Sequence, residues 1–169
     1  AIHLDGAFMT ELFDEIQGLR ERYPESLSAV MPALQLAQER NGGWLSEQAF
    51  REVADALDLT TAYCLSIASF YDMFRLEPVG EHVVEVCTNI SCGLKGAQQV
   101  VEAFERELGL KAGETTDAFT LRTVECLGGC GWATIVAVDN RHRLHVQAAD
   151  VPRIVAELRG VEWVEAEDE

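Results

Sequence analysis

Four of the five cysteines in the chain occur in two pairs, a pattern typical of metal ligands or redox groups. Cys87 and Cys92 form a C-x4-C pair, and Cys126 and Cys130 form a C-x3-C pair. Each pair lies at the carboxyl end of a predicted strand. Because the carboxyl ends of neighbouring parallel strands meet at one edge of a sheet, we expect the two pairs to face each other.

Three kinds of site can use four thiols that converge in this way. A structural zinc site usually draws its ligands from tight C-x2-C pairs, and a thioredoxin-type dithiol needs C-x-x-C at the start of a helix. A [2Fe–2S] cluster takes two thiolates at each iron, which suits two pairs on two loops. Small residues beside the pairs let the backbone approach such a cluster, namely Gly93, Gly128, Gly129 and Gly131. The spacing therefore favours an iron–sulfur cluster, with zinc or disulfide chemistry as the alternatives.

The remaining candidate ligands lack a comparable context. Cys64 lies on a mostly apolar predicted helix, and we expect it to be buried in a core. His82, His142 and His145 could serve in a Rieske-like site, but four cysteines already suffice, so we expect these histidines on the surface or on strand faces. No catalytic triad or phosphate-binding glycine loop is present, and we expect no substrate chemistry from the isolated chain.

The first half of the sequence predicts a small helical bundle. Ser46 is a plausible N-cap for one of its helices. The last helix is markedly apolar, and its residues Phe70, Tyr71 and Phe74 either pack inside the bundle or form an interface with a partner. Apolar residues recur at spacings of three and four over residues 8–23, 27–39, 49–57 and 61–74.

The helical spacing of apolar residues ends at Pro78-Val79-Gly80, where a second domain is expected to begin. Residues 94–108 have helical spacing, and Asp150 can cap a last helix. Short β-branched or alternating runs predict strands over residues 82–86, 119–124, 134–138 and 143–146, the last two joined by a hairpin connection over residues 139–142. The predicted fold class is α/β: a helical bundle over residues 1–79, then a thioredoxin-like β-α-β-β-β-α domain over residues 80–169.

Composition limits the partners of the chain. Its 169 residues include 13 Lys and Arg against 29 Asp and Glu, a net charge of −16, which repels nucleic acid. Residues 161–169 form an acidic run that we expect to be a solvated tail. No apolar run approaches the roughly 20 residues of a membrane span. We therefore expect a soluble, cytoplasmic protein that does not insert directly into a membrane.

The cysteine motifs carry a family resemblance. CTNISC, and VECLGGC with TTDAFTLRT before it, resemble the thioredoxin-like [2Fe–2S] ferredoxin family. The resemblance extends through NGGWLSEQAFREVADALDL and covers residues 27–158. It implies that Cys87, Cys92, Cys126 and Cys130 each ligate the cluster. Many members have Ala-Pro after the last ligand, where this chain has Ala133-Thr134 preceded by the large Trp132.

This family includes the E subunit of bacterial respiratory complex I and small subunits of NAD-dependent formate dehydrogenases and hydrogenases. The resemblance implies an electron-transfer subunit of NADH:quinone oxidoreductase that exchanges single electrons with a partner carrying FMN and NAD(H). It also implies further iron–sulfur subunits and a place at the inner face of the membrane through the complex. The alternatives are the equivalent subunit of a formate dehydrogenase or hydrogenase, or a zinc-bound or scaffold subunit.

Overall fold

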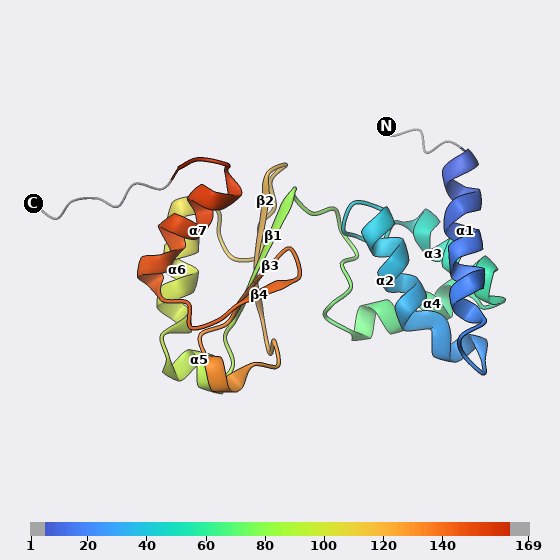
Figure 1. Cartoon of the computed structure of the whole chain (residues 1–169), viewed down its shortest axis with the longest axis horizontal. Helices are drawn as coiled ribbons and strands as arrows, with labels where there is room; N and C mark the ends of the chain where they lie inside the picture. The colour runs from blue at the N-terminus through green and yellow to red at the C-terminus, as the bar shows by residue number, and fades with distance from the viewer. Residues whose placement is uncertain (1–5, 163–169) are drawn as a thin grey trace, which may run out of the picture. The chain divides into compact units, whose positions relative to one another are not determined.

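The computed structural model describes residues 6–162 and divides the chain into two compact units, one ending at Pro78 and one beginning at Val79. The first unit is helical, and the second places helices on a sheet (Figure 1). Most of the acidic run predicted as a tail, residues 163–169, lies outside the described part of the chain. Each unit has its own hydrophobic core.

The first unit packs one apolar face of each helix around a common core that includes Ile16, Leu34 and Val53. Cys64 is fully buried in this core, as its apolar context predicted. Ser46 accepts a hydrogen bond from the Ala49 N–H at 3.1 Å and so caps its helix as predicted. The helices are α1 (Gly6–Arg20), α2 (Val30–Arg40), preceded by a 3-10 turn (Ser26–Ala29), α3 (Glu47–Leu57) and α4 (Thr61–Phe70).

The prediction that the last helix of the bundle extends to Phe74 is wrong, because α4 ends at Phe70. The side chain of the buried Gln38 binds the following segment: its Oε1 accepts from the Arg75 N–H at 2.7 Å, and its Nε2 donates to the Met73 carbonyl at 3.1 Å. These bonds replace helical ones and turn Phe74 into the core, where it is 5% exposed.

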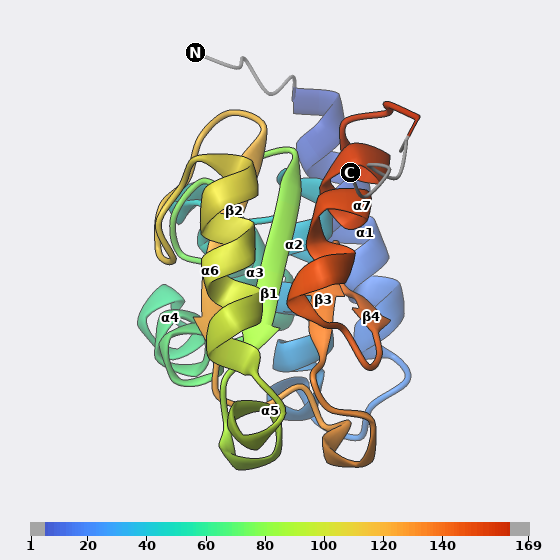
Figure 2. The ribbon, with the colours of Figure 1, turned by 90° about the vertical axis from the view of Figure 1, so that its left-hand side faces the viewer.

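The second unit has a four-stranded sheet of order β2-β1-β3-β4. Strands β1 and β2 are parallel, and the pairs β1–β3 and β3–β4 are antiparallel. Helices α6 and α7 lie side by side on one face of this sheet (Figure 2). The α/β, thioredoxin-like fold class predicted from the sequence is confirmed. The elements are β1 (His82–Cys87), α5 (Ile90–Leu94), α6 (Ala97–Leu108), β2 (Phe119–Val124), a 3-10 turn (Cys130–Trp132), β3 (Val136–Val138), β4 (Arg141–Arg143) and α7 (Val151–Leu158).

Strand β4 and the start of α7 differ from the sequence predictions. Strand β4 begins at Arg141 because Asp139 and Asn140, with φ of 49° and 63°, form a two-residue hairpin turn. The expected strand over residues 143–146 is therefore shifted toward the turn. Asp150 precedes α7, but its carboxylate accepts from the Gln147 N–H at 2.9 Å and does not cap α7 with its side chain.

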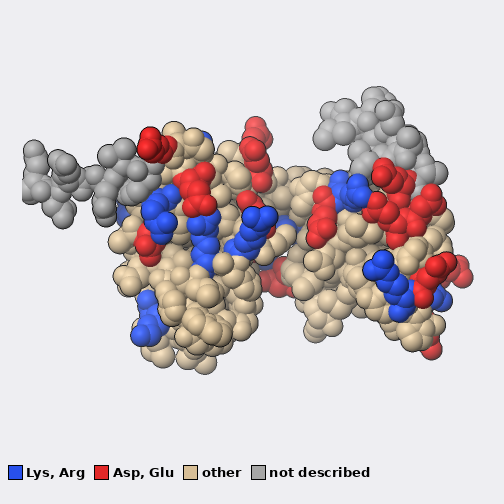
Figure 3. All heavy atoms as spheres, viewed as in Figure 1, with Lys and Arg blue, Asp and Glu red and all other residues tan. Residues whose placement is uncertain are grey.

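Charge is unevenly spread over the described surface. Figure 3 shows acidic side chains over both units, while the lower end of the second unit, where α5 lies in Figure 1, is largely uncharged. The sequence agrees, because residues 88–94 and 126–134 contain no charged side chain. Between residues 6 and 162, no helix combines the length and the apolar character needed to cross a membrane.

Candidate metal centre

The parallel pairing of β1 with β2 positions the first cysteine of each pair. In the strand register Cys87 lies opposite Val124, so Cys126 follows only two residues beyond the paired position. The Cys87 N–H donates to the Ile135 carbonyl at 3.1 Å, and the Thr88 N–H donates to the Val124 carbonyl at 3.1 Å. These bonds fix the end of β1 between the last residue of β2 and the residue before β3.

Cys92 lies on α5, a short helix that the sequence analysis did not predict. Asn89 begins this helix, and its Oδ1 accepts from the Ile90 N–H at 2.7 Å. An Asn two residues after a strand is a helix-start signal that could have revealed α5. Cys87 and Cys92 are 4% and 2% exposed and share a small apolar cluster with Ala97, Val124 and Ile135.

The thiol of Cys92 is protonated more readily than usual because burial raises its pKa. The Ile135 backbone N–H acts in the opposite direction, while the nearby Cys87 and Cys130 thiols raise the pKa further. Cys92 therefore lies close enough to both thiols to feel their charge. A bound metal would reverse this preference, since a coordinating thiol is deprotonated by the ion.

Cys126 and Cys130 lie in a different setting, on an exposed loop after β2. The Gly128 N–H approaches the Cys126 Sγ at 3.3 Å, and Gly128 has a φ of 74°, which favours glycine. Gly129 lies against Ile135: a Cβ at this position would meet the Ile135 Cδ1 at 2.1 Å. The loop therefore requires small residues both for its backbone conformation and for its packing.

Side chains outside the cysteines connect the loops of the site. The Asn89 Nδ2 donates to the Glu125 Oε2 at 3.3 Å, and the Cys87 thiol donates to the Glu125 carbonyl at 3.7 Å. The Thr134 hydroxyl donates to the Lys95 carbonyl at 3.3 Å and so connects the segment before β3 to the end of α5. The roles of Asn89 and Thr134 could not be predicted from the sequence, because polar contacts between distant loops leave no periodic signal.

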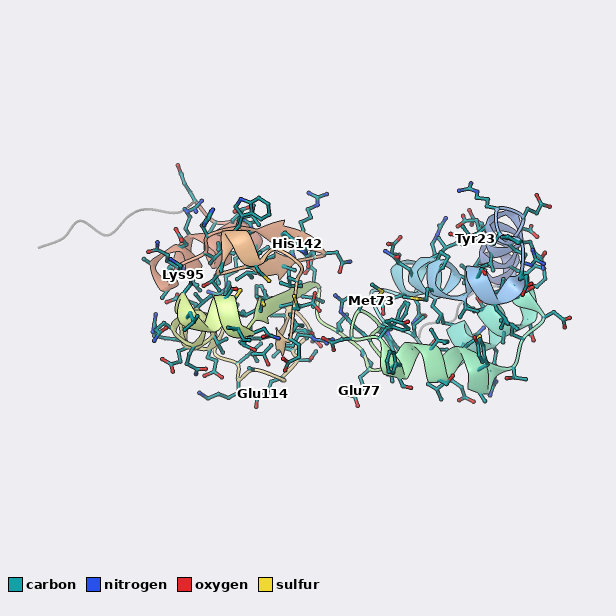
Figure 4. All side chains as sticks on the ribbon, turned by 90° about the horizontal axis from the view of Figure 1, so that it is seen from below. Tyr23, Met73, Glu77, Lys95, Glu114 and His142 are labelled. Carbon is teal, nitrogen blue, oxygen red and sulfur yellow. The ribbon has the colours of Figure 1, made fainter. Side chains whose placement is uncertain are left out.

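Cys64, His82 and His142 lie elsewhere, whereas His145 adjoins the exposed loop through its backbone N–H, which donates to the Trp132 carbonyl at 2.9 Å. Cys64 belongs to the first unit, and His82 lies at the start of β1, where its Nδ1 is 2.8 Å from the Asp139 Oδ2. His142 extends from β4 and is labelled in Figure 4. Among residues 6–162, no three His, Cys, Asp or Glu side chains are close enough together to hold a single metal ion.

The donor set fits a [2Fe–2S] cluster in chemical terms. Thiolates are the ligands such clusters use, and backbone N–H groups near the sulfurs stabilise their negative charge. Two such groups are present, those of Ile135 at Cys92 and Gly128 at Cys126. A thioredoxin-like sheet with two cysteine pairs at the carboxyl ends of parallel strands defines the class of protein as an iron–sulfur carrier.

The comparison with protein families agrees with this class. Residues 16–159 match the thioredoxin-like [2Fe-2S] ferredoxin family, so the chain belongs to that family and its cofactor is a [2Fe–2S] cluster. The E 2 subunit of NADH-quinone oxidoreductase from Rhizobium meliloti (strain 1021) is 37% identical over 153 residues, which cover 89% of this chain and 90% of that protein. The E subunit of the same enzyme from Rickettsia felis is 40% identical over 124 residues, covering 71% and 74% of the two chains.

A solved structure has the same fold. A chain of NAD+-reducing [NiFe]-hydrogenase in the air-oxidized state superposes with a TM-score of 0.66 over 78% of this chain, at 18% sequence identity. The match covers only 23% of that hydrogenase chain. This likeness concerns the arrangement of the helices and strands.

Proposed function

We propose that the chain is the [2Fe–2S] electron-transfer subunit of an NADH:quinone oxidoreductase. Relatives named as the E subunit of this enzyme cover most of the chain at 35–40% identity, which supports the proposal. The protein is then an oxidoreductase as part of its complex. Four cysteines at one end of the second unit supply the site, and no other chemistry is needed from this chain.

The observation that carries the proposal is the placement of two cysteine pairs at the ends of β1 and β2. Cys87 and Cys92 would hold the cluster from the buried side, and Cys126 and Cys130 from the exposed loop. When bound, such a cluster accepts and returns single electrons. The protein's own residues exclude water on the buried side and donate backbone N–H groups toward the sulfurs.

We further propose that the electron partner is a flavin subunit that carries FMN and binds NAD(H). The first unit offers a surface for such a partner, because Phe70 is 79% exposed and meets Tyr71 edge to face at 5.0 Å between ring centroids. Exposed aromatic side chains are enriched at protein interfaces. The partner and further iron–sulfur subunits would also hold the chain at the inner face of the membrane.

The electron-transfer role is tested with the anaerobically loaded full chain. Dithionite should bleach the visible absorption of the cluster. The reduced cluster should then give an electron paramagnetic resonance signal from one unpaired electron. NADH alone should not bleach it, whereas NADH with the flavin subunit should. Rapid bleaching by NADH in the absence of a partner would contradict the proposal that the flavin subunit, and not this chain, oxidises NADH.

The docking role of the first unit is tested by polar substitutions on the full chain. Phe70→Ser combined with Tyr71→Ser should weaken binding to the flavin subunit without changing the cluster spectrum. Leu27→Ser is the matched control, because Leu27 is 51% exposed on the same unit but belongs to the 3-10 turn before α2. Equal binding by the double variant and the control would mean that this aromatic pair does not contact the partner.

A further inference from the structure

Trp132 is held tightly at the exposed cysteine pair. It ends the 3-10 turn Cys130–Trp132, and its backbone N–H donates to the Gly129 carbonyl at 2.9 Å. Its carbonyl accepts from the His145 N–H at 2.9 Å. Both backbone groups are therefore paired, which fixes where the indole leaves the chain.

The indole packs beside Gly129, in the middle of the cysteine loop. Its Cε3 lies 4.0 Å from the place where a Cβ on Gly129 would be, on the side also occupied by Ile135. Trp132 is 55% exposed, so part of the ring packs on the loop and the rest faces solvent. The nine residues 126–134 carry no charge, and Trp132 is the largest apolar group among them.

We infer that Trp132 limits the access of water to the exposed cysteine pair and so holds the reduction potential of the cluster low. The inference rests on the proposed [2Fe–2S] site. An oxidised cluster with four thiolates is already an anion, and reduction adds a further negative charge. Water stabilises the more charged, reduced state, and an apolar cover opposes it, since the apolar surroundings of a metal site set its solvent access and potential.

This role makes Trp132 a positioning residue, because it acts through the water near the ligands and not as a ligand. The buried pair, Cys87 and Cys92, does not need such a residue, because Ile135 and Val124 already exclude water there. At the exposed pair, Leu127 packs inward against this apolar cluster, and the indole of Trp132 packs beside Gly129. A smaller or polar residue at this position would leave the loop open.

The test compares Trp132→Ala and Trp132→Phe in the full chain, loaded anaerobically. Redox titration followed by electron paramagnetic resonance gives the midpoint potential, and a ferrous-iron chelator gives the rate of cluster loss. We expect the alanine variant to shift the potential to more positive values and to lose the cluster several-fold faster. The phenylalanine variant should stay close to the unsubstituted chain, and Leu27→Ala, an exposed position on the other unit, should change neither quantity.

If the alanine variant does not retain its cluster, Trp132→Leu takes its place in the titration. The leucine variant should shift the reduction potential in the same direction, by a smaller amount. An unchanged or more negative potential in these variants would overturn the inference, as would an effect seen only on binding of the flavin subunit. Failure of the proposed function itself is separate, because it would appear as a missing cluster signal in the unsubstituted chain.

Discussion

The two cysteine pairs of the site have unlike surroundings. Cys87 ends a strand and Cys92 lies on a capped helix, and both are buried among apolar side chains. Cys126 and Cys130 lie on an exposed, glycine-rich loop. The difference indicates that folding alone fixes the first pair, whereas the second pair depends on local backbone bonds and, when loaded, on the cluster.

The largest expected effect is loss of the cluster when either pair is broken. Replacing Cys87, Cys92, Cys126 or Cys130 singly by serine should abolish or strongly deplete the visible absorption, because a hydroxyl is a poor substitute for a soft thiolate ligand. Cys64→Ser is the control, since Cys64 is buried in the other unit. Iron content per chain checks the result, and full iron binding by any of the four variants would remove that residue from the ligand set.

When the cluster is absent, the two cysteine pairs should differ in how much they contribute to the stability of the second unit. In the metal-free chain Cys87→Ser and Cys92→Ser place a hydroxyl in an apolar cluster, which we expect to lower the free energy of unfolding of the second unit by about 1–3 kcal/mol. Cys126→Ser and Cys130→Ser alter exposed side chains and should stay within about 0.5 kcal/mol. Urea unfolding measures both. Equal destabilisation by all four would contradict the contrast between the pairs.

The exposed loop should tolerate a methyl group at one glycine and not at another. Gly129→Ala brings a Cβ into Ile135, so we expect a loss of about 1–3 kcal/mol from overpacking and reduced cluster occupancy. Gly131→Ala is the matched control, because beyond its chain neighbours no atom lies within 4 Å of the added Cβ. Absorbance per chain and urea unfolding report the two effects. A stable, fully loaded Gly129→Ala variant would mean that Ile135 moves aside at no cost.

The smallest expected effect on stability comes from an ion pair between β4 and α7, away from both cysteine pairs. Arg143 donates two hydrogen bonds to the Glu157 carboxylate, at 2.7 and 2.9 Å, and this bonding lowers the pKa of Glu157 below its ordinary 4.5. The pair therefore stabilises the fold fully above pH 4.5, and the stabilisation is lost as pH falls through the lowered pKa.

Glu157→Gln should remove this pH dependence and cost less than about 1 kcal/mol, because the pair is partly exposed to solvent. Unfolding measured at several pH values checks the expectation. The variant should keep its cluster, which separates a general loss of stability from damage to the site. A parallel loss of iron would show that the two are coupled.

The sequence predicted the elements whose pattern is periodic. The alternating run of β2 and the buried position of Cys64 follow from side-chain spacing, and both agree with the structure. Helix α5 was missed because five residues are too few for a periodic signal. Strand β4 was misplaced because the hairpin turn, and not the apolar pattern, sets its register.

The candidate site was likewise predictable only in part. The sequence predicted that the cysteines lie at strand ends, and the parallel pairing of β1 with β2 agrees. The burial of one pair and the exposure of the other could not be predicted, since they depend on how α5 and Ile135 pack. Ligation by the four cysteines stays a prediction.

The most direct test of the central claim is the metal content of the full chain prepared without oxygen. We expect two iron atoms and two acid-labile sulfides per chain, as the [2Fe–2S] family implies, and an electron paramagnetic resonance signal from one unpaired electron after dithionite reduction. Stoichiometric zinc with neither iron nor sulfide would contradict it.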